Sequence, residues 1–160
     1  MIIHLVDQQK ALPFDKDAFE PLVSQVLRLE NQACDEVSIH LVESQTISSL
    51  HEQFFDDPSP TDCISFPLDD EEESFYRILG EVFICPETAL NYAKEHSVDP
   101  YEETTLYLVH ALLHLMGYDD IEEEDILEMR QAEKRHLDQL RTSNNLLRPP
   151  LTGDILVNPT

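Results

Sequence analysis

The sequence has 160 residues, of which 33 are Asp or Glu and 10 are Lys or Arg, so the formal net charge at pH 7 is −23. This length predicts one domain, and the charge repels nucleic-acid backbones at long range, which argues against a DNA-binding protein. Cys34, Cys63 and Cys85 are odd in number and form no C-x-x-C pair, which argues against a disulfide framework and a cysteine zinc site. No stretch approaches 18 uncharged apolar residues, so no membrane span is expected. These features predict a cytoplasmic protein.

The first half of the chain alternates between strand patterns and helix patterns. Apolar residues predict a strand at residues 2–6, and apolar positions at helical spacing predict a helix at 17–30, whose start is delayed or kinked by Pro21. Alternating apolar and polar residues predict a half-buried strand at 37–42. A polar helix at 46–55 is expected next, and the turn-forming stretch DDPSPTD ends it.

The second half of the chain begins with two strands and continues with helices. We expect strands at 63–68 and 79–86, the latter an interior strand because it is apolar on both faces, and helices at 87–96, 100–116 and 121–141. The order βαβαββααα predicts an α+β domain, in which a small mixed four-stranded sheet packs against about five helices. This single domain is expected to span residues 1–141, and the segment 142–160 to be a flexible C-terminal tail.

Two histidines lie inside the apolar stretch LYLVHALLHLMGYDD, residues 106–120. Asp99 and Pro100 are typical of the start of the helix that carries them. His110 and His114 are four residues apart, so both imidazoles lie on one face of this helix and can bind one metal ion. The alternative is a pair of core histidines, each satisfied by a hydrogen bond, which is the commoner role of a single histidine on an apolar helix.

Gly117 and the two aspartates that follow it extend the pattern to H-x3-H-x2-G-x2-D. A glycine here permits a left-handed turn that brings Asp119 or Asp120 back toward the histidines, although either aspartate could instead cap the next helix. Three protein ligands would leave the fourth position of a zinc ion open to water, as in catalytic sites. Ala111 stands where a zinc protease has its general-base glutamate, which disfavours peptide hydrolysis.

The stretch HALLHLMGYDD resembles the H-G-x-L-H-L-x-G-Y-D-H signature of the YbeY family, and EVSIHLVE, PTDCISFP and LGEVFICPE resemble other blocks of that family in the same order. The resemblance covers roughly residues 36–125. It implies an α+β fold with a mixed sheet and a zinc-dependent endoribonuclease that acts in ribosomal RNA maturation. The metal ligands that it implies are His110, His114 and Asp120, and they suit zinc or another divalent metal.

Three positions depart from the family pattern. Asp120 stands where the family has a third histidine, and its negative charge makes the bound ion a weaker Lewis acid, so we expect a higher pH optimum than for a three-histidine site. Ala111 replaces a glycine, which favours the helix. Phe55 stands where the family has a functionally important arginine; phenylalanine cannot hold a phosphate group, and Arg77 is a candidate to replace that arginine in space.

These features lead to three functional hypotheses. The first is a single-strand-specific, zinc-dependent endoribonuclease that acts on ribosomal RNA precursors, with a general base that the sequence does not assign. The second is a non-catalytic or weakly catalytic ribosome-assembly factor with a structural metal, whose acidic surface contacts ribosomal proteins or an assembly GTPase. The third is a zinc hydrolase of another substrate, such as a peptide. None of them involves DNA or a membrane.

Overall fold

The computed structural model describes three parts of the chain, residues 1–57, 61–68 and 76–151. The expected turn falls partly outside these residues, at 58–60, as does the end of the expected tail, at 152–160. In chain order the elements are β1 (Ile2–Gln8), a one-turn 3₁₀ helix (Lys16–Ala18), α1 (Phe19–Leu29), β2 (Glu36–Val42), α2 (Ser44–Phe55), β3 (Cys63–Pro67), β4 (Ile78–Ile84), α3 (Pro86–His96), α4 (Pro100–Leu115) and α5 (Glu123–Thr142). The predicted order of elements and the α+β class are confirmed.

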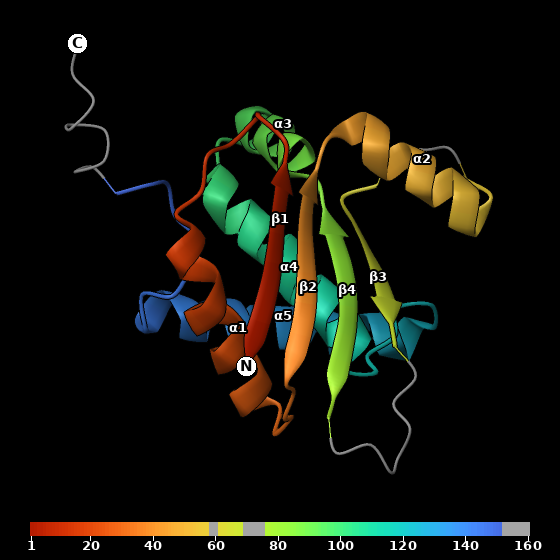
Figure 1. Ribbon diagram of the computed structural model, residues 1–160, viewed down its shortest axis with the longest axis vertical. Coiled ribbons are helices and arrows are strands. Elements are labelled where there is room, and N and C mark those ends of the chain that lie inside the picture. The colour runs from red at the N-terminus through yellow and green to blue at the C-terminus, as the bar shows by residue number, and fades with distance from the viewer. Residues whose placement is uncertain (58–60, 69–75, 152–160) are drawn as a thin grey trace.

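The four strands form one mixed sheet in the order β1-β2-β4-β3 (Figure 1). β2 is parallel to both of its neighbours, β1 and β4, and β3 is antiparallel to β4. β4 therefore lies inside the sheet, as its two-sided apolar pattern predicted. Gly80 on β4 has φ +148°, and a Cβ there would lie 2.5 Å from the carbonyl oxygen of Phe66 and 2.8 Å from Leu115 Cδ2. Only glycine lets the last turn of α4 pack this closely on the sheet.

Helix α4 is the centre of the helical layer. It passes behind the sheet and contacts β3, β4, α3 and α5 (Figure 1). Asp99 caps its start, since its carboxylate accepts a hydrogen bond of 2.8 Å from the N–H of Tyr101, and Pro100 occupies the first helical position as predicted. α4 is buried on nearly all sides because it lies between the sheet and other helices. The core between the two layers includes Phe19, Leu22, Ile39, Leu41, Ile84, Leu108, Leu112, Leu113, Met129 and Leu140.

Helix α2 lies apart from the other helices, beside β3 at one edge of the sheet (Figure 1). A second, smaller cluster of buried side chains holds it there: Val42, Ile47, Ile64 and Cys85, with Leu50, Phe66 and Phe83 partly buried against them. The C-terminal end of α2 is thereby fixed close to β3, which also contacts α4.

The segment after α5 differs from the flexible tail that its composition indicated. Leu147 is buried, and its backbone N–H donates to Thr105 Oγ1 at 3.1 Å. Arg148 Nε donates to Asp15 Oδ2 at 3.0 Å. Single contacts of this kind anchor the segment without a regular element, which is why no periodicity in the sequence reports them. Residues up to Arg148 are therefore part of the packed domain.

Among the described helices, none has both the length and the apolar character needed to span a lipid bilayer.

Candidate metal centre

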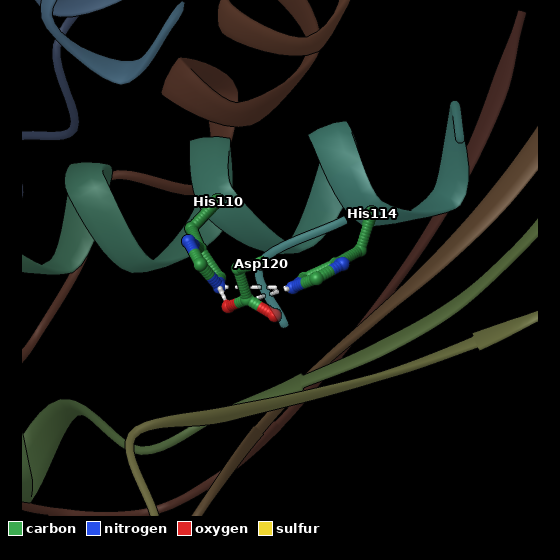
Figure 2. A group of neighbouring side chains, drawn as sticks. All are labelled: His110, His114 and Asp120. Atoms are coloured by element: carbon green, nitrogen blue, oxygen red, sulfur yellow. Dashed lines mark hydrogen bonds and ion pairs between the residues drawn. The ribbon is translucent and has the colours of Figure 1, made fainter. Parts of the chain in front are cut away.

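The C-terminal end of α4 turns the chain back onto its own histidines. The N–H of Gly117 donates to His114 O at 3.1 Å and the N–H of Tyr118 donates to Leu113 O at 3.0 Å, the paired bonds of a Schellman motif. Gly117 has φ +105°, a conformation that L-residues rarely adopt. The expected left-handed turn is therefore present, and it brings Asp120 to face His110 and His114 (Figure 2).

Three side-chain atoms meet at this point. Nε2 of His110 lies 3.1 Å from Nε2 of His114, and Oδ2 of Asp120 lies 3.4 Å and 3.3 Å from these two nitrogens. Bonds of about 2.0–2.2 Å to a tetrahedral zinc ion place two ligand atoms roughly 3.3–3.6 Å apart. The triangle of donor atoms therefore fits one zinc-sized ion with small adjustments.

The other ring nitrogen of each histidine is held by an acceptor. His110 Nδ1 lies 2.5 Å from Glu133 Oε2, and His114 Nδ1 lies 2.9 Å from the carbonyl oxygen of Tyr118. A carboxylate and a carbonyl only accept hydrogen bonds, so each neutral imidazole carries its proton on Nδ1 and directs a lone pair from Nε2 toward the other donors. This is the arrangement that ligating histidines use, with an outer partner that fixes the tautomer.

Glu133 is a buried carboxylate on α5 with two cationic or polar partners. Burial alone would raise the pKa of Glu133, but hydrogen bonds from His110 and Arg130 outweigh it and hold the pKa below its ordinary value. Arg130 Nη1 lies 3.0 Å from Glu133 Oε1. Glu133 therefore remains ionised at neutral pH and accepts a hydrogen bond from His110 Nδ1.

The convergence of these donors bears on the two interpretations of the histidine pair. A pair of satisfied core histidines would have a partner for both nitrogens of each ring. Here two Nε2 lone pairs and a carboxylate oxygen face one another, and they repel unless a cation lies between them. The short Nε2–Nε2 separation, with Asp120 as a third donor, favours a metal ion at that point.

A cleft of about 500 Å³ opens in front of the three donors. Its described lining contains no Lys or Arg and includes three aspartates. The lining residues are His51, Phe55, Thr61, Asp62, Cys63, Ile64, Ser65, Pro67, His110, His114, Asp119, Asp120 and Ile121. Ser65 Oγ donates to Ala111 O at 3.0 Å and so ties β3 to α4 at the floor of the cleft. Ala111 itself is fully buried and presents no base to the cleft.

Phe55, where the family pattern has an arginine, lines this cleft. Arg77 does not replace that arginine: it is absent from the cleft lining, and its Nη1 donates to Gln32 Oε1 and Ala33 O, both at 2.9 Å. Arg77 thus binds the loop between α1 and β2.

Two other groups near the donors have different roles. Asp119 Oδ1 accepts a hydrogen bond from the N–H of Asp120 at 2.8 Å, and neither aspartate caps α5, which starts after Glu122 without a side-chain cap. Burial raises the pKa of the Cys63 thiol well above its usual range, and Asp62 adds to the effect. Burial therefore favours the protonated thiol of Cys63, whereas metal ligation requires the thiolate.

Glu133 and Tyr118 are the functional partners that the sequence reasoning missed. The Tyr118 carbonyl belongs to the backbone, so no residue type marks it. Glu133 had a signal: it is the charged member of the stripe Met129, Ala132, Glu133, His136 and Leu140, which is the buried side of α5. A charged residue in such a stripe is rarely buried unless it is paired.

The fold and the site together define an α+β protein in which two histidines of the central helix and an aspartate of the loop after it face a cleft, in a geometry that suits a divalent metal. The sequence model of the family described as Endoribonuclease YbeY matches residues 4–141, and the chain belongs to this family.

Curated relatives support this assignment. The protein named Endoribonuclease YbeY of Protochlamydia amoebophila is 54% identical over 141 residues, which cover 88% of this chain and 94% of that protein. Proteins of the same name from Chlamydia trachomatis serovar D and Chlamydia pneumoniae are 35% and 37% identical over 149 residues. These alignments cover 92% and 91% of this chain, and 92% and 94% of the two proteins respectively.

A solved structure agrees with the fold. The solution structure of a Thermotoga maritima protein is similar, with a TM-score of 0.60 and 26% identity, over 90% of this chain and 95% of that one. The resemblance that the sequence motifs indicated is thus confirmed at the level of family and fold.

Proposed function

We propose that this protein is a zinc-dependent, single-strand-specific endoribonuclease that acts on ribosomal RNA precursors in the cytoplasm. The observation that carries the proposal is the convergence of His110 Nε2, His114 Nε2 and Asp120 Oδ2 at zinc-ligand separations in an open cleft. The matching family and the relatives named Endoribonuclease YbeY support the reaction class. The three free cysteines suit a reducing compartment.

The residues of this chain hold the ion and orient its donors. His110, His114 and Asp120 would be the three ligands, with Glu133 and the Tyr118 carbonyl fixing the two rings. A zinc ion held by these residues would supply Lewis acidity, which can polarise a phosphoryl oxygen and lower the pKa of water. The cleft in front of the donors gives an RNA strand access to His110, His114 and Asp120. A peptide hydrolase is disfavoured because Ala111 lacks the general-base function.

The experiment is cleavage of synthetic precursor ribosomal RNA fragments, single-stranded and duplex, by purified protein with zinc or with a chelator. We expect cleavage of single strands that the chelator and His110→Ala abolish. The matched control is His4→Ala, because His4 also pairs with a carboxylate, Glu36, but lies on β1 away from the cleft. Equal cleavage by wild type and His110→Ala would contradict the proposal.

A second function, a ribosome-assembly factor with a structural metal, is favoured by one observation. The described cleft lining has no cationic side chain to hold a phosphate, and Phe55 occupies the place of the family arginine. Under this alternative the protein retains one zinc ion and cosediments with ribosomal subunits, yet cuts no precursor RNA at any pH. Ribosomal proteins or an assembly GTPase would then be its partners.

A further inference from the structure

Five rings form a continuous row from the cleft across the sheet, and we call it the aromatic row: Phe54, Phe55, Phe66, Phe83 and His40. The ring centroid of Phe66 lies 4.9 Å from that of Phe54 and 6.3 Å from that of Phe55. Phe83 lies 5.7 Å from Phe66 in an edge contact, and His40 stacks on Phe83 at 4.3 Å. The row thus joins the end of α2 to strands β3, β4 and β2.

The cleft end of the aromatic row is open to solvent. Phe54 is 56% exposed and Phe55 is 52% exposed, whereas most large apolar side chains on α1 and α4 are buried in the core. Two neighbouring phenylalanines, each more than half exposed, form an apolar patch with free ring surface. His51, one turn before Phe55, adds a further ring at 5.4 Å from Phe55 and also lines the cleft.

Phe55 belongs both to the aromatic row and to the lining of the metal cleft. A polymer whose backbone reaches the three donors therefore enters a cleft that has Phe55 of the row in its wall. Charge restricts what this polymer can gain there. The chain has a formal net charge of −23 at pH 7, and the described cleft lining includes Asp62, Asp119 and Asp120 but no Lys or Arg. Electrostatic attraction to phosphate, the usual source of nucleic-acid affinity, is unavailable from this lining.

We propose that the aromatic row is a stacking platform for the unpaired bases of a single-stranded RNA whose backbone lies in the metal cleft. This inference rests on the proposed nuclease function and adds how its substrate is held. Bases stack on aromatic side chains irrespective of sequence, and only unpaired bases have free faces. Phe55 thus replaces a phosphate contact with a base contact, and selection of single strands follows from the need for an exposed base.

The binding experiment uses the absence of tryptophan from the chain. Phe54→Trp introduces one fluorophore into the row, and Leu127→Trp, on α5 at a position that is 60% exposed, is the matched control. Both are made in the full chain with His110→Ala, so that RNA is not cut. The probes are a single-stranded RNA 12-mer, its duplex, and a 12-mer of abasic residues. We expect quenching of Phe54→Trp by the single strand alone and no quenching of Leu127→Trp.

Alanine variants measure the contribution of the row to affinity. Phe54→Ala or Phe55→Ala should weaken binding of the single strand by roughly 5-fold to 100-fold, the loss typical of one base–aromatic stack, while Leu127→Ala changes it less than about 2-fold. Binding is measured in the chain with His110→Ala, and unchanged zinc content of the same alanine variants with His110 intact reports that they remain folded at the site. Because stacking releases no counterions, the weakening should persist at high salt.

Three results would overturn the platform. The abasic RNA could bind as tightly as the normal strand, or the alanine variants could bind RNA as wild type does. Alternatively, the variants could convert a sedimenting dimer to a monomer without affecting RNA, which would make the row a self-association surface. If wild type cuts RNA but the alanine variants bind unchanged, the platform fails and the nuclease stands. If no RNA is cut but the single strand quenches Phe54→Trp, the nuclease fails and the platform stands.

Discussion

Glu133 of α5 is buried and accepts a hydrogen bond of 2.5 Å from His110 Nδ1. The two residues are 23 positions apart in the sequence and meet because α5 packs along α4. The orientation of a proposed metal ligand therefore depends on the packing of two helices. Tyr118 adds a second link, since its carbonyl holds His114 and its hydroxyl donates at 2.8 Å to Oε1 of Glu30, the residue that follows α1.

Removal of a donor should remove the metal. His110→Ala and Asp120→Ala are each expected to lower the zinc content from about one ion per chain to well below it, because two remaining ligands bind a zinc ion weakly. Elemental analysis of the purified proteins measures this, with His4→Ala as the control that keeps its zinc. Full zinc content in both variants would show that the ion, if any, binds elsewhere.

Loss of the Glu133 charge should weaken the site without emptying it. Glu133→Gln keeps a group of the same size but no longer offers a carboxylate to His110 Nδ1, and such outer partners contribute about 10-fold to 100-fold in metal affinity. Competition with a chromogenic chelator measures the affinity. Glu124→Gln, an exposed position on the same helix, is the matched control. Equal affinity in all three proteins would argue against the orienting role.

Exchange of Asp120 for histidine should shift the pH dependence of cleavage. Asp120→His restores the third histidine of the family pattern and removes a negative charge from the ion, which then acidifies its water more strongly. The pH–rate profile for a single-stranded RNA should therefore move to lower pH than in wild type. A profile that stays in place, or moves to higher pH, would show that Asp120 does not set the acidity at the site.

Glu30 should make the free energy of unfolding depend on pH below about pH 4.5. Burial alone would raise the pKa of Glu30, but hydrogen bonds from His136, Tyr118 and Arg135 outweigh it and hold the pKa below its ordinary value of 4.5. A lowered pKa in the folded state contributes stability above the unfolded pKa, and this stability is lost as the pH falls through the folded pKa.

Urea unfolding of wild type and Glu30→Gln at several pH values tests this expectation. The difference in unfolding free energy should be largest near pH 7 and shrink as the pH falls below 4.5, because protonated Glu30 resembles glutamine. Glu20→Gln, an exposed residue in the first turn of α1, should show a small and pH-independent difference. A difference for Glu30→Gln that is constant with pH would contradict the assignment.

The segment after α5 should contribute to stability. Leu147→Ala removes a buried side chain and is expected to lower the unfolding free energy by about 2–5 kcal/mol. Leu151→Ala, in the same segment but 58% exposed, should change it by less than about 0.5 kcal/mol. Urea unfolding measures both variants, and equal stabilities would mean that the segment does not pack in solution.

Much of this fold was predictable because its signals are local. Asp99, Pro100 and Gly117 mark the ends of α4, and the two-sided apolar pattern of β4 predicts its interior place in the sheet. Helix α2 begins two residues earlier than its sequence pattern predicted, and α5 begins two residues later. Neither helix has a side-chain cap that would mark its start in the sequence. A helix without a capping side chain begins where tertiary packing allows its first turn to form.

The sequence by itself determined the types of element and the pair of histidines on one helical face, since helical periodicity and the helix end at Gly117 depend on about a dozen consecutive residues. Its motifs also indicated the family. The family motif already indicated Asp120, and the tertiary structure shows Asp120 beside the two histidines. Only the tertiary structure decided that Glu133 holds His110 and that Phe55 lines the cleft. It also decided that Leu147 is buried. These facts depend on contacts between distant segments, and such contacts follow from how helices and sheet pack together rather than from any local pattern.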